Sequence, residues 1–258
     1  MSGVEVVRAW TPQGFEAIEA PLGATLAADS WLVDDGLVLA FERHRRRFAD
    51  AVGEAGGDRH EALVAAEAAG RLVPESGRWS PRLDLTPEGI RLRIRPAPPV
   101  TSTVKAVTAA RDPRALPLRK GPDLVALAEL QAEETARAGT AVEPIITVDG
   151  HVAEGTWSAL LWWRDAALCV PADDIPRLGS VTAAVVVELA RDEGIEVRQE
   201  RSAPAELAGC EVWLANALRG IRAVTDWIDG PALAPAHRAA AWQARLAAQR
   251  TGTPVIRR

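Results

Sequence analysis

Residues 110–117 interrupt the pattern of the chain and divide it into two parts. This stretch, Ala110-Arg111-Asp112-Pro113-Arg114-Ala115-Leu116-Pro117, has two prolines and no apolar periodicity, which is typical of a linker. On either side of it, alternating segments are mixed with segments of helical period. A chain of 258 residues is long enough for two separate cores. We therefore expect an α/β (α+β) protein with a small N-terminal domain (1–112), a linker (113–119) and a larger C-terminal domain (120–258).

The N-terminal part contains the clearest strand pattern of the chain. Residues 90–95 alternate strictly between apolar and arginine side chains, which predicts a half-buried strand, and residues 100–107 are predicted to pair with it. Phe41, Phe48 and Val52 recur at helical spacing and predict one buried helix face. Further predicted elements are a strand at 4–10, a hairpin at 30–38 and an alanine-rich helix at 59–71.

The C-terminal part predicts a longer alternation of helices and strands. Leu124, Leu127 and Leu130 step along a predicted helix at 123–138 that Gly139 ends. Asp149-Gly150 predicts a tight turn between two strands, at 141–148 and 152–163. Further predicted elements are strands at 165–170, 195–197, 211–214 and 219–229, and helices at 180–193 and 235–250.

Composition narrows the class of protein. A hydrophobic content of 48% with 25% charged residues is typical of an ordinary globular protein, and a net charge of −5 disfavours nucleic acid as a partner. No apolar run is long enough to cross a membrane, and the first residues lack a signal-peptide pattern. Cys169 and Cys210 both fall in predicted buried strands, so we expect no disulfide framework, no metal site and a reducing cytoplasm.

A chemical role for lysine has two candidates, because Lys105 and Lys120 are the only lysines of the sequence. A lysine becomes a nucleophile when burial or nearby positive charge lowers the pKa of its amine. Lys120 follows Arg119 at the end of the predicted linker, whereas Lys105 falls in a predicted strand outside every motif and is expected to be structural. Taken alone, Lys120 would also fit a solvated position at the start of a helix.

Two further motifs complete a possible site for pyridoxal 5'-phosphate. Glu154 follows a predicted turn, where a carboxylate is either solvated or able to pair with the pyridine nitrogen of such a cofactor. Ser180, Val181 and Thr182 open a predicted helix, whose first N–H groups cap locally or bind phosphate. Arg47 belongs to the basic run at 43–47, from which one arginine could pair with phosphate.

Taken together, these motifs resemble a known family. His44-x-x-Arg47-Phe48, Lys120, Gly150-x-Val152-x-Glu154-Gly155 and Ser180-Val181-Thr182 are similar in order and spacing to the class IV aminotransferases of pyridoxal-phosphate fold type IV. The resemblance extends from about residue 33 to residue 229 and implies a two-domain, D-amino acid aminotransferase-like fold. It also implies a homodimer acting on a small amino substrate, in which Lys120 is the catalytic residue and binds pyridoxal 5'-phosphate covalently. In it, Glu154 would hold the pyridine nitrogen, and Arg47, Ser180, Val181 and Thr182 would bind the phosphate.

The segment 213–221 is most similar to 4-amino-4-deoxychorismate lyases. Asn216 and Ala217 stand where aminotransferases usually carry small hydroxyl residues, and the resemblance places both at the cofactor. It implies a β-elimination that converts 4-amino-4-deoxychorismate to 4-aminobenzoate and pyruvate, as in folate biosynthesis. The alternatives are an aminotransferase of branched-chain or D-amino acids, and a non-catalytic family member with a binding or structural role.

The sequence departs from the family pattern in three places. Ala159 follows Ser158 where the family often has asparagine, and Asp29-Ser30-Trp31 replaces the usual phenylalanine-glutamate-threonine stretch. The chain has no tyrosine, so another donor must serve the cofactor's ring oxygen. We therefore expect a substrate pocket that differs from that of the aminotransferases.

Overall fold

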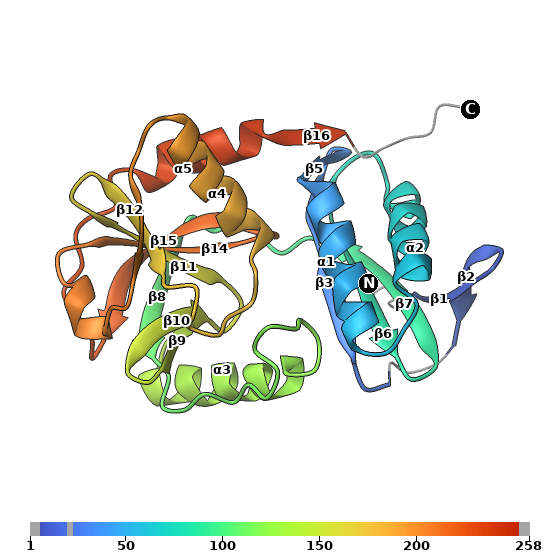
Figure 1. Ribbon diagram of the computed structural model, residues 1–258, viewed down its shortest axis with the longest axis horizontal. Coiled ribbons are helices and arrows are strands. Elements are labelled where there is room, and N and C mark those ends of the chain that lie inside the picture. Colours follow the sequence, from blue (N-terminus) through green and yellow to red (C-terminus); the bar gives the residue numbers. More distant parts are fainter. Residues whose placement is uncertain (1–5, 20–22, 253–258) are drawn as a thin grey trace. The chain divides into compact units, whose positions relative to one another are not determined.

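The computed structural model describes residues 6–19 and 23–252, which form two compact units (Figure 1). The first unit comprises the described residues up to Pro99, the segment Arg119–Pro122 and the chain from Gln249 onward. The second comprises Val100–Leu118 and Asp123–Ala248. This division differs from the boundaries that we expected at residues 112 and 120. The chain passes between the units more than once, and the short segment with Lys120 belongs to the first of them.

The first unit is an eight-stranded sheet with two helices. Its strand order is β16-β5-β4-β6-β7-β1-β2, and β3 pairs with β6 beside this path. The helices α1 and α2 lie against each other and contact strands of this sheet. The strands are β1 (Val7–Thr11), β2 (Gly14–Ile18), β3 (Ala27–Ser30), β4 (Val33–Asp34), β5 (Leu37–Leu39), β6 (Arg78–Thr86), β7 (Gly89–Pro96) and β16 (Arg250–Gly252), and the helices are α1 (Phe41–Glu54) and α2 (Arg59–Leu72).

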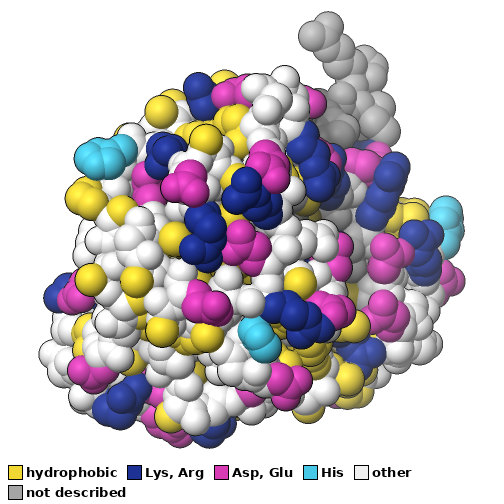
Figure 2. Space-filling view, turned by 60° about the vertical axis from the view of Figure 1, so that its left-hand side comes forward, with side chains coloured by type: hydrophobic (Ala, Val, Ile, Leu, Met, Phe, Trp, Pro, Cys, Tyr) yellow, Lys and Arg dark blue, Asp and Glu magenta, His cyan; other side chains and the backbone are white. Residues whose placement is uncertain are grey.

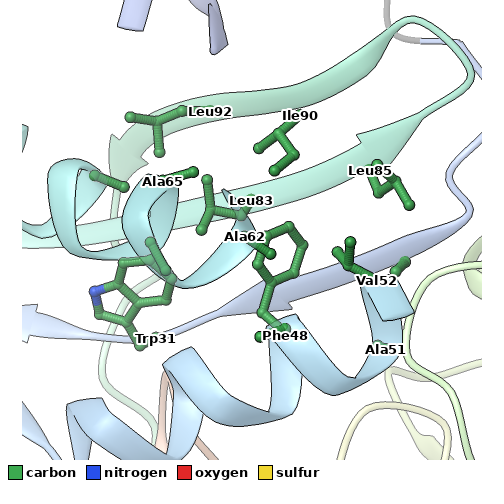
Figure 3. Packing of buried hydrophobic residues seen from close by; sticks show 14 of the residues in the cluster. Trp31, Phe48, Ala51, Val52, Ala62, Ala65, Leu83, Leu85, Ile90 and Leu92 are labelled. Atoms are coloured by element: carbon green, nitrogen blue, oxygen red, sulfur yellow. The ribbon is translucent and has the colours of Figure 1, made fainter. Parts of the chain in front are cut away.

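The core of the first unit lies between its helices and its sheet. Figure 3 shows Phe48 of α1 beside Leu83 of β6, with Trp31 next to them. The buried face of α1 contains Phe41, Phe48 and Val52, as predicted. Four alanines and a glycine of α2 are buried as well, and small side chains of this kind let the two helices approach closely.

The predicted pairing of 90–95 with 100–107 was wrong. The first of these strands, β7, pairs with β6 and β1. The second, β8 (Thr103–Thr108), lies in the other unit between β15 and β9. Prolines at 96, 98 and 99 remove backbone donors that a hairpin would need here. The true partner, β6, was not predicted.

The second unit is an eight-stranded sheet that closes on itself. Its order is β10-β9-β8-β15-β14-β11-β12-β13, and an additional pairing of β10 with β11 joins the ends of a six-stranded ring. The predicted strand at 152–163 is thus two strands with a turn between them. The remaining strands are β9 (Glu143–Val148), β10 (His151–Gly155), β11 (Ala159–Arg164), β12 (Ala167–Pro171), β13 (Val197–Glu200), β14 (Glu211–Asn216) and β15 (Gly220–Ile228), and the helices are α3 (Leu124–Ala138), α4 (Val181–Asp192) and α5 (Ala239–Ala248).

Apolar side chains from these strands form the core of the second unit. Ile145, Trp162, Leu214 and Val224 belong to one buried cluster. Both cysteines are buried and free, in agreement with their predicted burial. Gly139 ends α3 at a positive φ of 65°, as the sequence predicted, because glycine adopts this conformation at little cost.

The surface shows no concentration of one charge on the face that Figure 2 draws. Acidic and basic side chains are interspersed there with apolar ones. Among the described helices, none has the length and apolar character that a membrane crossing requires.

Candidate active site

The backbone of Lys120 is fixed against strand β3 of the first unit. The N–H of Ala28 donates a hydrogen bond to the carbonyl of Lys120 over 2.7 Å. Gly121 has a φ of +136°, and a Cβ at this position would lie 2.7 Å from the Cα of Ala27. Only glycine tolerates both this conformation and this approach, so Gly121 keeps the lysine beside β3.

The amine of Lys120 lies in a partly buried, positively charged environment. Its Nζ donates a hydrogen bond to Ser30 Oγ over 3.0 Å. Burial lowers the pKa of the Lys120 amine to about 8; Arg47 and Arg82 lower it as well, while Asp29 opposes them. The sequence had suggested burial and Arg119 as causes, and the structure adds charges from α1 and β6. A substantial fraction of the amine is therefore neutral near pH 8, as a nucleophilic lysine requires.

Asp29 holds two side chains of α1 in place. Its carboxylate is fully buried and accepts hydrogen bonds from Arg47 Nε at 2.6 Å and from a terminal nitrogen of the same guanidinium at 2.9 Å. The Nδ1 atom of His44 lies 2.8 Å from Oδ1 of this carboxylate, the oxygen that also accepts from the terminal nitrogen of Arg47. Burial would raise the pKa of Asp29, but Arg47 and His44 hold it well below its usual range. Burial lowers the pKa of His44, so the imidazole is neutral and donates to Asp29.

Among the described residues in this part of the first unit, four basic side chains lie near two carboxylates. Arg82 and Arg93 both pair with Asp84, at 2.9 Å and 3.0 Å. Arg47 and Lys120 accompany Asp29. The arrangement favours an anionic ligand.

Glu154, the predicted partner of the cofactor's pyridine nitrogen, lies on β10 of the second unit. The residue is 9% exposed. Its Oε1 accepts a hydrogen bond from Arg114 at 2.5 Å, and its Oε2 accepts one from the N–H of Leu178 at 3.2 Å. Burial raises the pKa of Glu154 to about 7, against the opposing effect of Arg114. Each carboxylate oxygen has a second lone pair for a further donor.

Arg114 is the functional candidate that the sequence analysis missed. Its side chain is 2% exposed although it lies in the proline-punctuated stretch. It donates two hydrogen bonds of 2.8 Å to Asp112 and one of 3.1 Å to the carbonyl of Pro176. Asp123 accepts from the N–H groups of Ala115 and Leu116 and fixes the same stretch. No pattern in the sequence distinguished Arg114 from the many solvated arginines.

The beginning of α4 has the form that the sequence predicted. Ser180 caps the helix, because its Oγ accepts from the N–H of Ala183 at 3.1 Å. Val181 and Thr182 are buried. Within the described residues, Thr182 Oγ1 has no hydrogen-bond partner. A buried hydroxyl without a partner is costly, and a ligand oxygen at the helix N-terminus would satisfy it.

Asn216 lies at the end of β14 and fixes the turn that contains Ala217. Its Nδ2 donates to Ser158 Oγ at 2.9 Å. Its Oδ1 accepts from the N–H groups of Leu218 and Arg219. Ser158 also accepts from Arg222, which pairs with Glu143. The turn after β14 and the turn after β10 are therefore joined by buried polar contacts.

Each unit thus carries one part of the predicted site. Lys120 and Arg47 lie together in the first unit. The second unit carries Glu154, the beginning of α4 and the turn with Asn216. Lys105 is exposed on β8, with its Nζ 3.8 Å from Asp226.

Comparison with known proteins identifies the family of the chain. The model of the family described as amino-transferase class IV matches residues 26–227. The chain belongs to the amino-transferase class IV family. The matched region includes every residue predicted for the site, from Arg47 to Ala217.

Solved structures similar to this class IV chain include three aminotransferases. A fold IV transaminase from Curtobacterium pusillum has a TM-score of 0.75 and 20% identity, with 95% of this chain and 97% of the other covered. A hypothetical aminotransferase from Mycobacterium tuberculosis, bound to alpha-ketoglutarate and PMP, has a TM-score of 0.79 and 20% identity over 95% and 98%. A branched-chain aminotransferase from Thermoproteus uzoniensis has a TM-score of 0.79 and 14% identity over 97% and 100%. The expected fold type IV architecture is confirmed.

A curated relative of this class IV chain is the aminodeoxychorismate lyase of Bacillus subtilis (strain 168). The two are 34% identical over 74 residues, which are 28% of this chain. The match spans 25% of the relative's length.

Proposed function

We propose that the chain binds pyridoxal 5'-phosphate and acts as a 4-amino-4-deoxychorismate lyase. Lys120 binds the cofactor covalently, and Glu154 holds its pyridine nitrogen. Arg47, Ser180, Val181, Thr182, Asn216 and Ala217 bind its phosphate and the atoms around it. The working form is a cytoplasmic homodimer.

The residues present fit this cofactor. Thr182 Oγ1 is a buried hydroxyl at a helix N-terminus with no partner in the part of the chain that the structure describes, and phosphate binds readily at such a terminus. The pKa of Lys120 is lowered to about 8, so the amine can form a covalent bond near neutral pH. Burial raises the pKa of Glu154, and Arg114 opposes this rise and so favours the charged carboxylate.

The chain's own residues then perform the proton transfers. When bound, the cofactor withdraws electrons from the carbon next to the substrate nitrogen. Once the substrate amine has taken the place of Lys120, the Nζ of Lys120 would be free to remove the proton from that carbon as general base. The bond from the ring to the enolpyruvyl oxygen would then break and the carbocycle would become aromatic. The group would leave as enolpyruvate, which becomes pyruvate by taking up a proton equivalent to the one that Lys120 removed. Glu154 keeps the pyridine nitrogen protonated throughout.

The choice of lyase over aminotransferase depends on one observation, the pair Asn216-Ala217 after β14. Asn216 fixes the turn and contacts Ser158 through its amide group, where aminotransferases of the family usually carry a small hydroxyl residue. The similarity to the aminodeoxychorismate lyase of B. subtilis, 34% identity over 74 residues, also favours the lyase.

A test of the reaction is pyruvate release from 4-amino-4-deoxychorismate without any amino acceptor. We expect equimolar pyruvate and 4-aminobenzoate with the wild type and neither with Lys120→Ala. An aminotransferase would instead need a 2-oxo acid and would exchange its amino group with branched-chain or D-amino acids. Turnover that depends strictly on a 2-oxo acid contradicts the lyase and supports the aminotransferase.

A further inference from the structure

The turn after β14 presents Arg219, which forms no ion pair with any carboxylate of the described residues. The N–H of Arg219 is bound by Asn216 Oδ1 at 2.9 Å, so the backbone of the residue is fixed. Its side chain is partly buried, and its Nε is buried without a hydrogen-bond partner. Most other arginines of the second unit pair with a carboxylate, as Arg164 does with Glu200 and Arg198 with Glu196.

A second arginine increases the positive charge around Arg219. Arg222 lies close enough for its charge to act on Arg219, and its own Nε is buried without a partner. Glu143 is the nearby carboxylate, but one of its oxygens accepts from Arg222 and the other from the N–H of Trp157. Burial and the charge of Arg222 lower the pKa of Arg219, whereas the charge of Glu143 raises it. The buried Nε without a hydrogen-bond partner among the described residues is the unfavourable feature of this position. An anion bound there would offset the cost.

The position of the pair indicates what kind of anion it takes. Arg219 lies two residues after Ala217, in the turn assigned above to the cofactor, so the inference rests on the proposed function. In the first unit, Arg47 already has a carboxylate partner in Asp29. We propose that Arg219 binds an oxyanion of the loaded site, the phosphate of the cofactor or a carboxylate of the substrate, through the guanidinium that the fold leaves without a counter-ion. Arg222 adds charge behind it.

The test compares Arg219→Gln and Arg219→Lys with the matched control Arg198→Gln. Arg198 is an exposed arginine of the same unit, so the control removes the same charge outside the site. Three quantities are measured: the shift of the unfolding temperature of the cofactor-free protein by inorganic phosphate, the dissociation constants of pyridoxal phosphate and of pyridoxal from tryptophan fluorescence, and the KM for 4-amino-4-deoxychorismate. Unliganded Arg219→Gln should be at least as stable as the wild type, because a buried Nε that lacks a hydrogen-bond partner among the described residues is removed.

The two sources of the oxyanion give different results. If Arg219 binds the cofactor's phosphate, Arg219→Gln weakens the binding of pyridoxal phosphate about tenfold, because a charge-assisted hydrogen bond is lost. The dissociation constant of pyridoxal stays unchanged, and Arg219→Lys recovers part of the lost affinity for pyridoxal phosphate. If it binds the substrate's carboxylate, the cofactor constants stay constant and the KM rises about tenfold. In both cases the shift of the unfolding temperature by inorganic phosphate is smaller in Arg219→Gln than in Arg198→Gln, because one oxyanion-binding side chain is missing.

The inference is overturned if Arg219→Gln stays within about twofold of Arg198→Gln in all three quantities. The loss of a charge-assisted hydrogen bond to the oxyanion should change at least one of them by more than that. A wild type that does not bind pyridoxal phosphate would contradict the proposed function instead. In that event the inorganic-phosphate arm still decides whether Arg219 binds an oxyanion.

Discussion

The Nζ of Lys120 donates a hydrogen bond to Ser30 Oγ over 3.0 Å. Ser30 ends β3, directly after the buried Asp29 that holds Arg47 and His44. The lysine, its hydroxyl acceptor and the carboxylate that opposes its pKa shift thus come from two short segments that meet at one backbone hydrogen bond. This contact holds the amine of Lys120 in an environment that lowers its pKa, whereas Lys105 lies exposed on the surface.

The first prediction concerns the pH dependence of Lys120. Because burial lowers the pKa of its amine from 10.5 to about 8, the rate at which cofactor-free protein reacts with pyridoxal phosphate should reach half its maximum near pH 8. Asp29 raises this pKa, so Asp29→Asn should move the midpoint lower. Stopped-flow absorbance across pH 6–11 measures it. A midpoint near the ordinary value of 10.5 contradicts the environment described here.

A second prediction follows from Glu154. Its pKa is about 7 in the folded protein and 4.5 in the unfolded chain, so between these values the folded state binds more protons. The free energy of unfolding should therefore fall as pH rises from about 4.5 to about 7, by on the order of 3 kcal/mol from this group. Urea titrations at several pH values measure it. Glu154→Gln should lack this component, and equal slopes in both proteins would refute it.

The third prediction concerns Arg114. Replacing it by glutamine leaves Glu154 and Asp112 without their buried cation and should cost about 3 kcal/mol of unfolding free energy, as for other broken buried ion pairs. It should also raise the pKa of Glu154 further, because Arg114 lowers it. The pH window of the preceding prediction would then extend above 7. Arg111→Gln, which removes an exposed pair with Glu133, is the control and should cost less than about 1 kcal/mol.

A fourth prediction is that loss of the Thr182 hydroxyl changes protein stability and cofactor affinity in opposite directions. Its buried hydroxyl has no partner within the described residues, so Thr182→Val should leave the cofactor-free protein as stable or stabilise it by about 1 kcal/mol. The same change should weaken pyridoxal phosphate several-fold, because the hydroxyl is then missing from the phosphate site. Thr182→Ser keeps the hydroxyl and serves as control. A loss of stability without loss of cofactor affinity would assign Thr182 to folding alone.

Local signals of the sequence were sufficient for many elements and for most of the candidate site. The face of α1, the end of α3 at Gly139 and the cap at Ser180 follow from periodicity and capping, which depend on neighbours in sequence. Pairing of strands depends on distant residues, which is why β6 was not predicted and β8 was given the wrong partner. The same reason explains Arg114, whose importance comes from Glu154, forty positions further along the chain.

The central claim is that Lys120 bonds covalently to pyridoxal phosphate, and one measurement tests it most directly. Purified protein is mixed with pyridoxal phosphate, its visible absorption is recorded, and the mixture is reduced with borohydride and digested for mass spectrometry. The account predicts a yellow band, and after reduction a phosphopyridoxyl group on the peptide with Lys120 and none on that with Lys105. Lys120→Ala should lose the band. A colourless wild type, or an equal label on Lys105 and in the variant, would contradict the account.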